Sequence, residues 1–416
     1  MQIEISPGKL SGTLRVPASK SIAHRILICA ALARGTSHIM GVDASRDLTA
    51  TMDVLKGFGA TFETNPATRV ITVHGIGGKE RPSSSIADCC ESGSTLRFLL
   101  PVAAALGIST TFYGQGRLPE RPITAYLREL PPKGVHFSSD HLPLTITGQL
   151  HPGTYELEGN VSSQYVTGLL FALSLLDHGS VIRLTSPLQS RPYVNLTLAC
   201  LQEFGVNIQE NGDDFLIPGG QMFHARDVQV EGDYSQAAFF YVANALGSNV
   251  ELTNLNPQSV QGDKQIVEIT RTMAEKLRLG QPAGFSIDAA NIPDLVPILA
   301  VLGTFGTEPS KITGAHRLIL KESNRLETTA ALLNGLGGKV NVTDDGLEIE
   351  PVSSLHGGTV DSYGDHRIAM CAAIAATRCT GDVTILHAEC VDKSYPAFYE
   401  DYNMLGGSAH VIVLES

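Results

Sequence analysis

The amino-acid sequence predicts an α/β protein of two similar domains, each made of three repeats, and three observations support this. The chain has 416 residues, which is more than one ordinary hydrophobic core holds. Hydrophobic residues make up 43% of it, charged residues make up 17%, and Trp is absent, which indicates a globular protein with an aliphatic core. A pattern of two helices and several short strands recurs about every 70 residues along the chain.

The second helix of each repeat is the easier one to recognise. Its apolar residues recur at helical spacing, and the segment stops at a Gly. The six copies span residues 46–59, 121–134, 191–205, 261–280, 325–338 and 396–407. We therefore expect six helices that end at these glycines.

A loop of small polar residues precedes the first helix of each repeat. The six loops are residues 19–21, 91–94, 162–164, 233–236, 291–294 and 363–366. Alternating segments between the two helices, such as residues 181–185, predict strands. The repeat is longer than common solenoid periods, which argues against a solenoid. With a boundary in the charged stretch 225–232, we predict one domain over residues 15–229 and a second over residues 1–14 and 230–416.

Charge and composition exclude several classes of protein. The net charge of −12 argues against a nucleic-acid partner but allows a local basic site for a small anion. The seven cysteines form no Cys-x-x-Cys pair, so we expect mostly buried thiols, no disulfide framework and no metal. The longest apolar runs, residues 98–108 and 295–302, are shorter than the roughly 20 residues of a membrane span. Residues 1–10 hold no apolar signal core, so a cytoplasmic protein without a membrane partner is expected.

The loops before the first helices are expected to bind anions, because a helix N-terminus presents backbone N–H groups. In the first repeat, Lys20 and Ser21 lie at such a start, and Arg25 follows on the same helical face. These three side chains together suit a phosphate group. An exposed helix that is merely capped is the alternative.

In the second repeat, Gly93 lets an anion approach the backbone closely. Arg97 leads into an apolar segment, where a guanidinium needs an anionic partner. The partner is either a ligand or a carboxylate of the chain, with Glu91 and Glu120 as the candidates. Arg117 follows in the next polar loop.

The third repeat presents a group of polar side chains. They are Ser162, Ser163, Gln164, Ser190 and Tyr193. Hydroxyls, an amide and a phenol suit a polyhydroxylated or phosphorylated ring. The alternative is that Ser162 and Ser163 merely cap a helix.

Titratable groups gather in the second half of the chain. They are Asp294, Lys321, Glu322, Arg325, His366, Arg367 and Lys393. Two carboxylates beside several cations are what proton transfer at an anionic substrate needs. The alternative is that these residues form helix caps and surface ion pairs.

Ten short segments resemble the 5-enolpyruvylshikimate-3-phosphate synthases, a family of enolpyruvyl transferases. In the order of that family, they are residues 19–25, 91–97, 117–122, 161–164, 190–193, 231–238, 291–294, 321–325, 363–367 and 393–396. The resemblance implies two similar domains, each of three βαβαββ units in an inside-out α/β barrel, with a cleft between them. It implies transfer of the enolpyruvyl group of phosphoenolpyruvate to the 5-hydroxyl of shikimate 3-phosphate, with release of phosphate through a tetrahedral intermediate. This is a step of the shikimate pathway, which supplies aromatic amino acid biosynthesis, and the resemblance implies a monomer without metal or organic cofactor.

The resemblance also implies roles for individual residues. The ligands of shikimate 3-phosphate would be Lys20, Ser21, Arg25, Ser162, Ser163, Gln164, Ser190, Tyr193, Asp294 and Lys321. The ligands of phosphoenolpyruvate would be Lys20, Gly93, Arg97, Arg117, Gln164, Arg325, Arg367 and Lys393. Asp294 would accept the proton of the attacking hydroxyl. Glu322, helped by Lys20 or Lys393, would protonate the methylene carbon. His366 would take part in breakdown of the intermediate.

The chain departs from the usual family pattern at four positions. Ala18, Phe98, Arg317 and Asn324 stand where Gly, Pro, Asn and Asp are common. The change at Asn324 is expected to weaken an ion pair with a neighbouring arginine. None of the four removes a proposed acid or base.

Two rival functions fit the sequence less well. The sister transferases that act on UDP-N-acetylglucosamine usually carry Asn after the N-terminal Lys and, in most members, a Cys in a loop of the second repeat. Here Ser21 follows Lys20, and residues 110–122 contain no Cys. A non-catalytic member of the fold would be expected to lose its acid and base groups, all of which this chain keeps.

Overall fold

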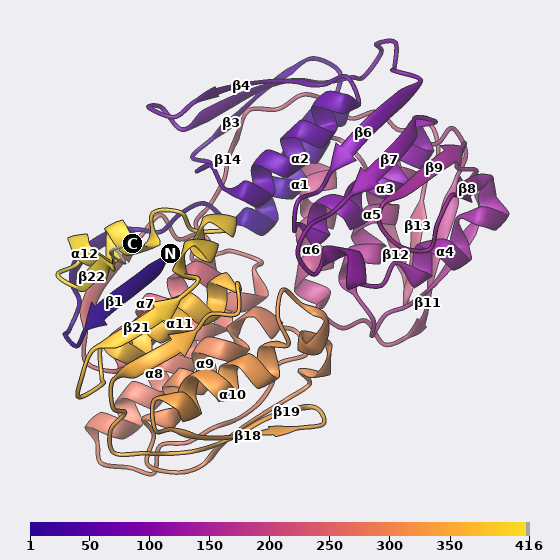
Figure 1. The fold of residues 1–416 in the computed structure, drawn as a ribbon. Helices are drawn as coiled ribbons and strands as arrows, with labels where there is room; N and C mark the ends of the chain where they lie inside the picture. The colour runs from indigo at the N-terminus through magenta and orange to yellow at the C-terminus, as the bar shows by residue number, and fades with distance from the viewer. Residues whose placement is uncertain (413–416) are drawn as a thin grey trace. The chain divides into compact units, whose positions relative to one another are not determined.

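The computed structural model describes residues 1–412, and the chain divides into two compact domains (Figure 1). Domain N is Ala18–Glu231. Domain C is Met1–Pro17 together with the chain from Gly232 onward. The chain thus passes from one domain to the other after Pro17 and after Glu231, whereas the sequence placed these crossings after residues 14 and 229.

Domain N contains three repeats, each with a four-stranded sheet and two helices. The sheets are β14 (Val228–Gln229)-β3 (Thr36–Met40)-β5 (Val70–His74)-β4 (Thr61–Asn65), β6 (Ser84–Asp88)-β7 (Ser109–Tyr113)-β9 (Leu144–Gly148)-β8 (Val135–Phe137), and β10 (Thr154–Glu158)-β11 (Ser180–Ser186)-β13 (Asp214–Ile217)-β12 (Gln209–Asn211). The helices are α1 (Lys20–Leu32), α2 (Arg46–Gly57), α3 (Gly93–Leu106), α4 (Thr124–Glu129), α5 (Ser163–Leu173) and α6 (Arg191–Glu203). In every sheet the first two strands are parallel and the other neighbours are antiparallel, so the three repeats share one topology.

Domain C also has three repeats, and two strands from the start of the chain complete them. Its sheets are β15 (Asn249–Thr253)-β2 (Ser11–Arg15), β16 (Ser286–Asp288)-β17 (Ser310–Thr313)-β19 (Gly346–Glu350)-β18 (Lys339–Thr343), and β20 (Gly358–Asp361)-β21 (Val383–Leu386)-β1 (Gln2–Ser6)-β22 (Ser408–Val411). The helices are α7 (Tyr234–Ala245), α8 (Gln265–Arg278), α9 (Val296–Thr304), α10 (Arg325–Gly335), α11 (His366–Ala376) and α12 (Phe398–Met404). Strand β1 lies between β21 and β22, antiparallel to both, and β2 pairs with β15 in parallel.

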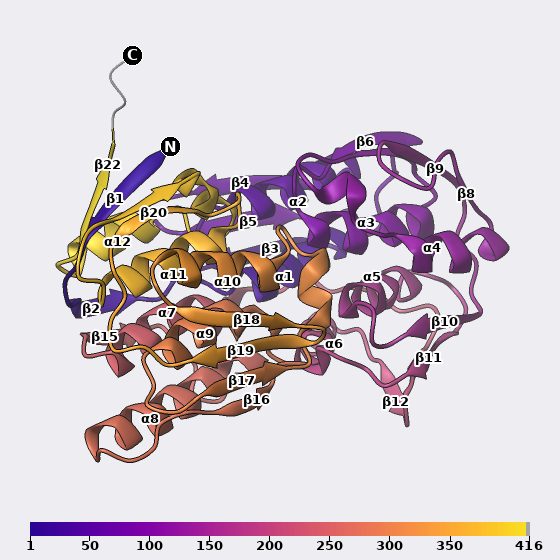
Figure 2. The same cartoon turned by 60° about the horizontal axis from the view of Figure 1, so that its bottom comes forward.

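The first helices of the repeats are buried on nearly all sides. All nine residues of α9 and all eleven residues of α11 are buried, and in α3 only Ser94 is not. A helix that is hydrophobic all round must be covered on every face. Figure 2 shows β16, β17, β18 and β19 as one layer, with α9 and α10 beside it. The two longest apolar runs of the sequence thus belong to buried helices, as predicted.

Glycines with positive φ explain why the sequence repeat is so regular. Gly59, Gly134, Gly205 and Gly280 have φ between 63° and 105°, the left-handed region that favours Gly after a helix. In the last two repeats the left-handed residue is the first Gly of a Gly-Gly pair, Gly337 or Gly406, one residue before the predicted stop.

A side-chain clamp joins helix to strand at three of the turns in domain C. Asn334 donates from Nδ2 to the Val340 carbonyl at 2.8 Å and accepts the Val340 N–H at 2.8 Å. Asn244 makes the same two bonds with Val250, and Asn403 makes them with Ala409. These clamps fix the step from helix into strand.

One predicted helix is much shorter than expected. Residues 121–134 were expected to form a full helix, but α4 covers only Thr124–Glu129 and a 3-10 turn follows at Pro131–Lys133. Pro131 and Pro132 lack the backbone N–H that an α-helix needs at those positions. The prediction was therefore wrong over half of this segment.

Candidate active site

Lys20, Ser21 and Arg25 lie at the start of α1, as the sequence predicted. Ser19 caps the helix by accepting the Ile22 N–H. Lys20 Nζ lies 2.9 Å from Asp47 Oδ2, which joins α1 to α2. Arg25 is only 3% exposed, so the exposed-helix alternative is wrong for this face.

Arg25 is held entirely by neutral groups. Its guanidinium donates to Thr197 Oγ1 at 2.8 Å, to the Ser21 carbonyl at 2.7 Å and to the Tyr193 carbonyl at 3.0 Å. It also lies over the Phe98 ring, 5.1 Å from the centroid. Burial lowers the pKa of Arg25 to about 10. The structure therefore brings the first repeat together with Tyr193 of the third.

Ser190 and Ser162 stand at the starts of the two helices of the third repeat. Ser190 is buried and has φ of 56°, a left-handed conformation directly before α6. Ser162 caps α5, because its hydroxyl accepts the Gln164 N–H at 3.3 Å. The capping interpretation thus describes Ser162 correctly, and Ser163 is buried in the first turn of α5.

Arg97 connects the second repeat with the third. Its Nη1 donates to Gln164 Oε1 at 2.8 Å and its Nη2 donates to the Pro122 carbonyl at 2.9 Å. The guanidinium lies 5.2 Å from the centroid of the Tyr165 ring, and Gln164 Nε2 donates to Ser94 Oγ at 3.1 Å. Within residues 1–412, Arg97 forms no ion pair, so the salt bridge to Glu91 or Glu120 is absent there.

The structure places Arg121, rather than Arg117, beside Gly93. A methyl group on Gly93 would lie 2.5 Å from Arg121 Nη1, and Arg121 is buried. Arg117 is 42% exposed and lies 3.5 Å from Glu120. The sequence shows both arginines in one Pro-containing loop, four positions apart, and gives no signal to choose between them.

Arg25 and Arg97 together make domain N suited to anions. Burying a charge is costly unless an opposite charge compensates it, and neutral acceptors compensate it only in part. Neither guanidinium has a carboxylate partner in the described part of the chain. A bound phosphate or carboxylate would therefore offset the free-energy cost of burying these two charges, which the neutral groups of domain N offset only in part.

In domain C, by contrast, the buried arginines have carboxylate partners. Arg325, at the start of α10, is 1% exposed. Its guanidinium meets Asp294 at 3.0 Å, Glu322 at 2.7 Å and Asp365 at 2.8 Å. The alternative of surface ion pairs is wrong for this buried cluster.

Asp294 bridges two arginines. One carboxylate oxygen accepts from Arg325 and the other accepts from Arg367 Nη2 at 3.0 Å. Burial alone would raise the pKa of Asp294, but Arg367, Lys321 and Arg325 outweigh it and hold the pKa well below its usual range. Asp294 lies inside the 3-10 turn Pro293–Leu295, not at its cap position, and pairs with two arginines, so it is more than a helix cap.

Lys393 and His366 complete the group at the start of α11. Lys393 is buried in the 3-10 helix Ala388–Lys393 and donates to the Gly364 carbonyl at 2.7 Å. His366 is buried as the first residue of α11, with Nδ1 at 3.8 Å from Asp365 Oδ1. Lys321 and Glu322 lie just before α10.

No role was predicted for two buried residues that contact this group. Asp365 is fully buried, caps α11 and accepts from Ser323 Oγ at 3.0 Å. Ser235, at the start of α7, accepts from Arg367 Nη2 at 3.0 Å. Both residues belong to segments that carried the family resemblance. Their partners lie more than 40 residues away in the sequence, so no local pattern indicates these contacts.

The unusual residues Asn324 and Arg317 have structural partners in domain C. Asn324 caps α10 by accepting the Glu327 N–H. Arg317 Nη2 donates to the Ala290 carbonyl at 2.8 Å. With Asn324 at this position, Arg325 pairs with Asp294, Glu322 and Asp365.

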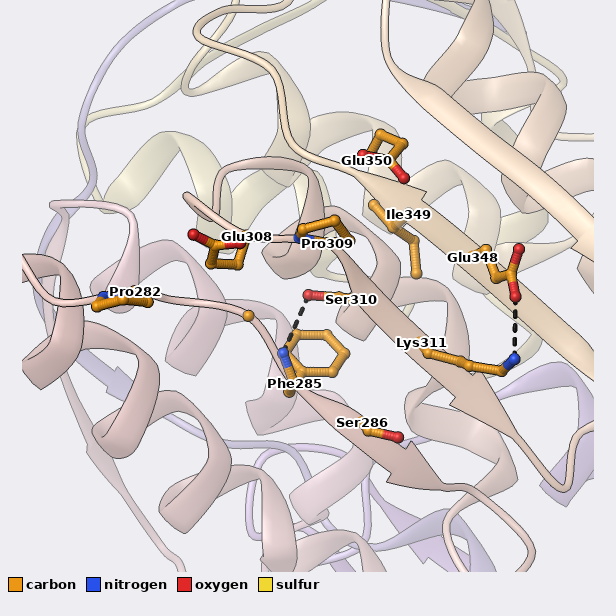
Figure 3. Close-up of a pocket in the computed structure, with 11 residues that line it drawn as sticks. Pro282, Phe285, Ser286, Glu308, Pro309, Ser310, Lys311, Glu348, Ile349 and Glu350 are labelled. Carbon is orange, nitrogen blue, oxygen red and sulfur yellow. Dashed lines mark hydrogen bonds and ion pairs between the residues drawn. The ribbon is translucent and has the colours of Figure 1, made fainter.

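A separate hollow of about 580 Å³ lies against β16, β17 and β19 of domain C (Figure 3). Lys311 and Glu348 form an ion pair at 2.9 Å on its wall, and Phe285 lines its centre. It contains none of the predicted site residues.

The cysteines and helices bear on the remaining expectations. All seven cysteines are free thiols, and six of them are buried, as predicted. In residues 1–412, no group of three or more His, Cys, Asp or Glu side chains could hold a metal ion. Within the same residues, every helix is too short or too polar to cross a membrane.

Known proteins resemble this chain over nearly its whole length. The family model described as EPSP synthase (3-phosphoshikimate 1-carboxyvinyltransferase) matches residues 5–402. The 3-phosphoshikimate 1-carboxyvinyltransferase of Clostridium novyi (strain NT) is 42% identical, covering 97% of each chain. That of Clostridium perfringens (strain ATCC 13124) is 41% identical, covering 98% of each.

Solved structures agree with these relatives. An EPSP synthase from Acinetobacter baumannii is 27% identical with a TM-score of 0.79, covering 99% of this chain and 100% of that one. The enolpyruvyl transferase NikO from Streptomyces tendae is 19% identical with a TM-score of 0.74, covering 98% of each chain, and so shares the fold. The α/β fold of two three-repeat domains is therefore that of the enolpyruvyl transferases. The chain belongs to the EPSP synthase family, the 3-phosphoshikimate 1-carboxyvinyltransferases.

Proposed function

We propose that this enzyme transfers the enolpyruvyl group of phosphoenolpyruvate to the 5-hydroxyl of shikimate 3-phosphate and releases phosphate. Membership of the family supports the reaction. The single structural observation that carries it is the contrast in charge between the domains. Domain N buries Arg25 and Arg97 among neutral acceptors, whereas domain C holds the ionised Asp294 between Arg325 and Arg367.

We propose that shikimate 3-phosphate is bound mainly by the first and third repeats. The assigned ligands are Lys20, Ser21, Arg25, Ser162, Ser163, Gln164, Ser190, Tyr193, Asp294 and Lys321. Arg25 supports this assignment, because its bonds to the backbone carbonyls of Ser21 and Tyr193 and to the Thr197 hydroxyl place a buried cation between the two repeats. A sugar-like ring with a phosphate needs that combination.

For phosphoenolpyruvate, we assign residues that surround a phosphate and a carboxylate with cations. They are Lys20, Gly93, Arg97, Arg117, Gln164, Arg325, Arg367 and Lys393, and we add Arg121. The burial of Arg121 against Gly93 supports the addition. Several cations are needed because the two anionic groups of this substrate repel each other and the phosphate of the acceptor.

The acid and base roles are those that the family resemblance implies, and the ionised state of Asp294 supports the role of that residue as the base. Asp294 is ionised and accepts the proton of the 5-hydroxyl as its oxygen attacks C2 of phosphoenolpyruvate. Glu322, helped by Lys20 or Lys393, delivers a proton to the methylene carbon, so that C2 becomes tetrahedral. Loss of a proton from that methyl group and cleavage of the C2–O bond to phosphate then restore the double bond, with His366 assisting.

We further propose that the enzyme acts as a monomer in the cytoplasm and uses no metal or organic cofactor. Its only partners would be the two small substrates, with no nucleic acid and no membrane. The net charge of −12 supports the exclusion of nucleic acid.

An assay of phosphate release tests the proposed function. The purified enzyme is supplied with phosphoenolpyruvate and either shikimate 3-phosphate or UDP-N-acetylglucosamine. We expect phosphate only with shikimate 3-phosphate and only when both substrates are present. Turnover with UDP-N-acetylglucosamine instead would assign the chain to the sister activity, and no turnover with either would favour a non-catalytic member of the fold.

A further inference from the structure

Ser235 links a buried carboxylate to Arg367. Its hydroxyl donates to Asp233 Oδ1 at 2.6 Å and accepts from Arg367 Nη2 at 3.0 Å. All three residues are at most 5% exposed. The link crosses from the start of α7 to the start of α11, which are far apart in the sequence.

The hydroxyl of Ser235 has a fixed direction. A serine hydroxyl has one proton, and Asp233, as a carboxylate, can only accept it. A lone pair of the oxygen is therefore left to face Arg367. The Nη2 nitrogen of Arg367 carries two N–H groups, one of which points to Ser235 and the other to Asp294. These two acceptors together fix that end of the guanidinium plane.

The neighbouring Arg325 is held in another way. Its Nε donates directly to the buried Asp365 carboxylate at 2.8 Å. For Arg367, the neutral hydroxyl of Ser235 stands between the guanidinium and Asp233. A carboxylate in direct contact would offset more of the positive charge than a hydroxyl at the same distance. Beside Asp294, which pairs directly with Arg367 Nη2, Ser235 thus fixes the guanidinium without placing a second carboxylate on the same nitrogen.

We propose that Ser235 is a positioning residue for phosphoenolpyruvate, which it serves by orienting Arg367 without neutralising it. The inference rests on the proposed function, in which Arg367 binds that substrate. It assigns a use to the 231–238 segment, which carries the family resemblance but supplies none of the assigned ligands. Ser235 acts through Arg367 and is not itself assigned as a ligand.

Steady-state kinetics of Ser235→Ala test this role. The Asp233 side chain caps α7 through the backbone N–H groups of Ser235 and Gln236, and these bonds survive the substitution. We expect the KM for phosphoenolpyruvate to rise about tenfold, because a charge-assisted contact that orients Arg367 is lost. The KM for shikimate 3-phosphate should change less than about twofold, and kcat should fall less than the KM rises.

Ser310→Ala is the matched control. Ser310 is also buried in domain C, and its hydroxyl accepts the Phe285 N–H at 3.2 Å, a contact that involves no assigned residue. The control should lose stability but keep both KM values. Ser235→Cys, which keeps the shape of the side chain with a larger atom that accepts hydrogen bonds only weakly, should give a smaller rise in the same KM and covers the case in which Ser235→Ala fails to fold.

The outcomes separate this inference from the proposed function. Phosphate release by the unaltered enzyme, combined with a normal KM for phosphoenolpyruvate in a folded Ser235→Ala or Ser235→Cys variant, overturns the inference alone. A drop in stability and in kcat at unchanged KM values would also overturn it, since that is what a purely structural serine produces. No phosphate release by the unaltered enzyme overturns both.

Discussion

Arg25 and Arg97 differ from Arg325 and Arg367 in what surrounds their charge. The first two donate to carbonyl, amide and hydroxyl oxygens. The second two share the carboxylate of Asp294. A cation without a carboxylate partner gains more from an incoming anion, whereas a cation that already holds one keeps that carboxylate ionised and in place. We therefore interpret domain N as the stronger anion binder and domain C as the source of the base.

Asp294→Asn and Glu322→Gln should each lower turnover by about 10²–10⁴-fold, because general acid and base groups typically contribute that much. Both amides keep the shape of the side chain, so substrate binding should survive. Turnover and binding of shikimate 3-phosphate are measured separately for each variant. Near-normal turnover in Asp294→Asn would remove Asp294 from the mechanism, whatever its contacts with the arginines.

The pair Arg121 and Arg117 offers a second test at this scale. Arg121 is buried against Gly93, whereas Arg117 is exposed beside Glu120. We expect Arg121→Ala to raise the KM for phosphoenolpyruvate by about tenfold to a hundredfold, since a charge-assisted contact contributes about 1.5–3 kcal/mol. Arg117→Ala should change it by much less. A larger effect at Arg117 would support Arg117, the residue that the family resemblance implies.

The sequence could predict most candidate residues because each stands at a helix start beside a short polar loop. It could not predict which groups they meet. The choice of Arg121 over Arg117, the bridge at Asp294 and the link through Ser235 depend on burial and on contacts between distant segments. Local sequence carries neither kind of information.

At the scale of the elements, the repeat owes its regularity to how each second helix ends. Gly59 and Gly205 take positive φ directly after their helices, and periodic apolar residues fill the helices themselves. Both signals are local, and for that reason the sequence predicted five of the six second helices well. Only α4 failed, because two consecutive prolines replaced its last turn.

The Asn334 clamp should stabilise domain C measurably. Asn334→Ala removes two hydrogen bonds and leaves the Val340 N–H and carbonyl without that partner, so we expect a loss of about 1–3 kcal/mol. Asn341→Ala is the control, because Asn341 is exposed on β18 and should cost less than about 0.5 kcal/mol. Urea denaturation gives both values. Equal losses in the two variants would show that the clamp contributes nothing specific.

At the scale of the whole molecule, the two domains repeat one plan but are not interchangeable. Each contains three repeats with a buried apolar helix under a sheet, and the N-terminal strands β1 and β2 complete sheets of domain C. The sequence repeat indicated the number of units. The pairing of β1 with β21 needs the fold, because no local pattern shows which distant strand an N-terminal segment joins.

Because Arg25 and Arg97 of domain N are buried without a carboxylate partner, a bound anion should stabilise the folded molecule. An anion that binds only the folded state stabilises it by about 1.4 kcal/mol when its concentration is ten times the Kd. Inorganic phosphate should therefore raise the melting temperature by about 2–4 °C at that concentration. Its physical cause would be the pairing of phosphate with Arg25 and Arg97, whose present partners are neutral.

Differential scanning calorimetry in phosphate and in potassium chloride of equal ionic strength checks this expectation. The double variant, which combines Arg25→Ala and Arg97→Ala, should lose most of the phosphate-induced rise in melting temperature while keeping any general effect of salt. Arg183→Ala is the matched control, because Arg183 is a half-exposed arginine of the same domain whose partners are the surface carboxylates Glu156 and Asp214. It should keep the full rise. If the double variant were stabilised by phosphate as much as the unaltered protein, the anion would bind elsewhere, and the two buried arginines would need another explanation for their lack of a carboxylate partner.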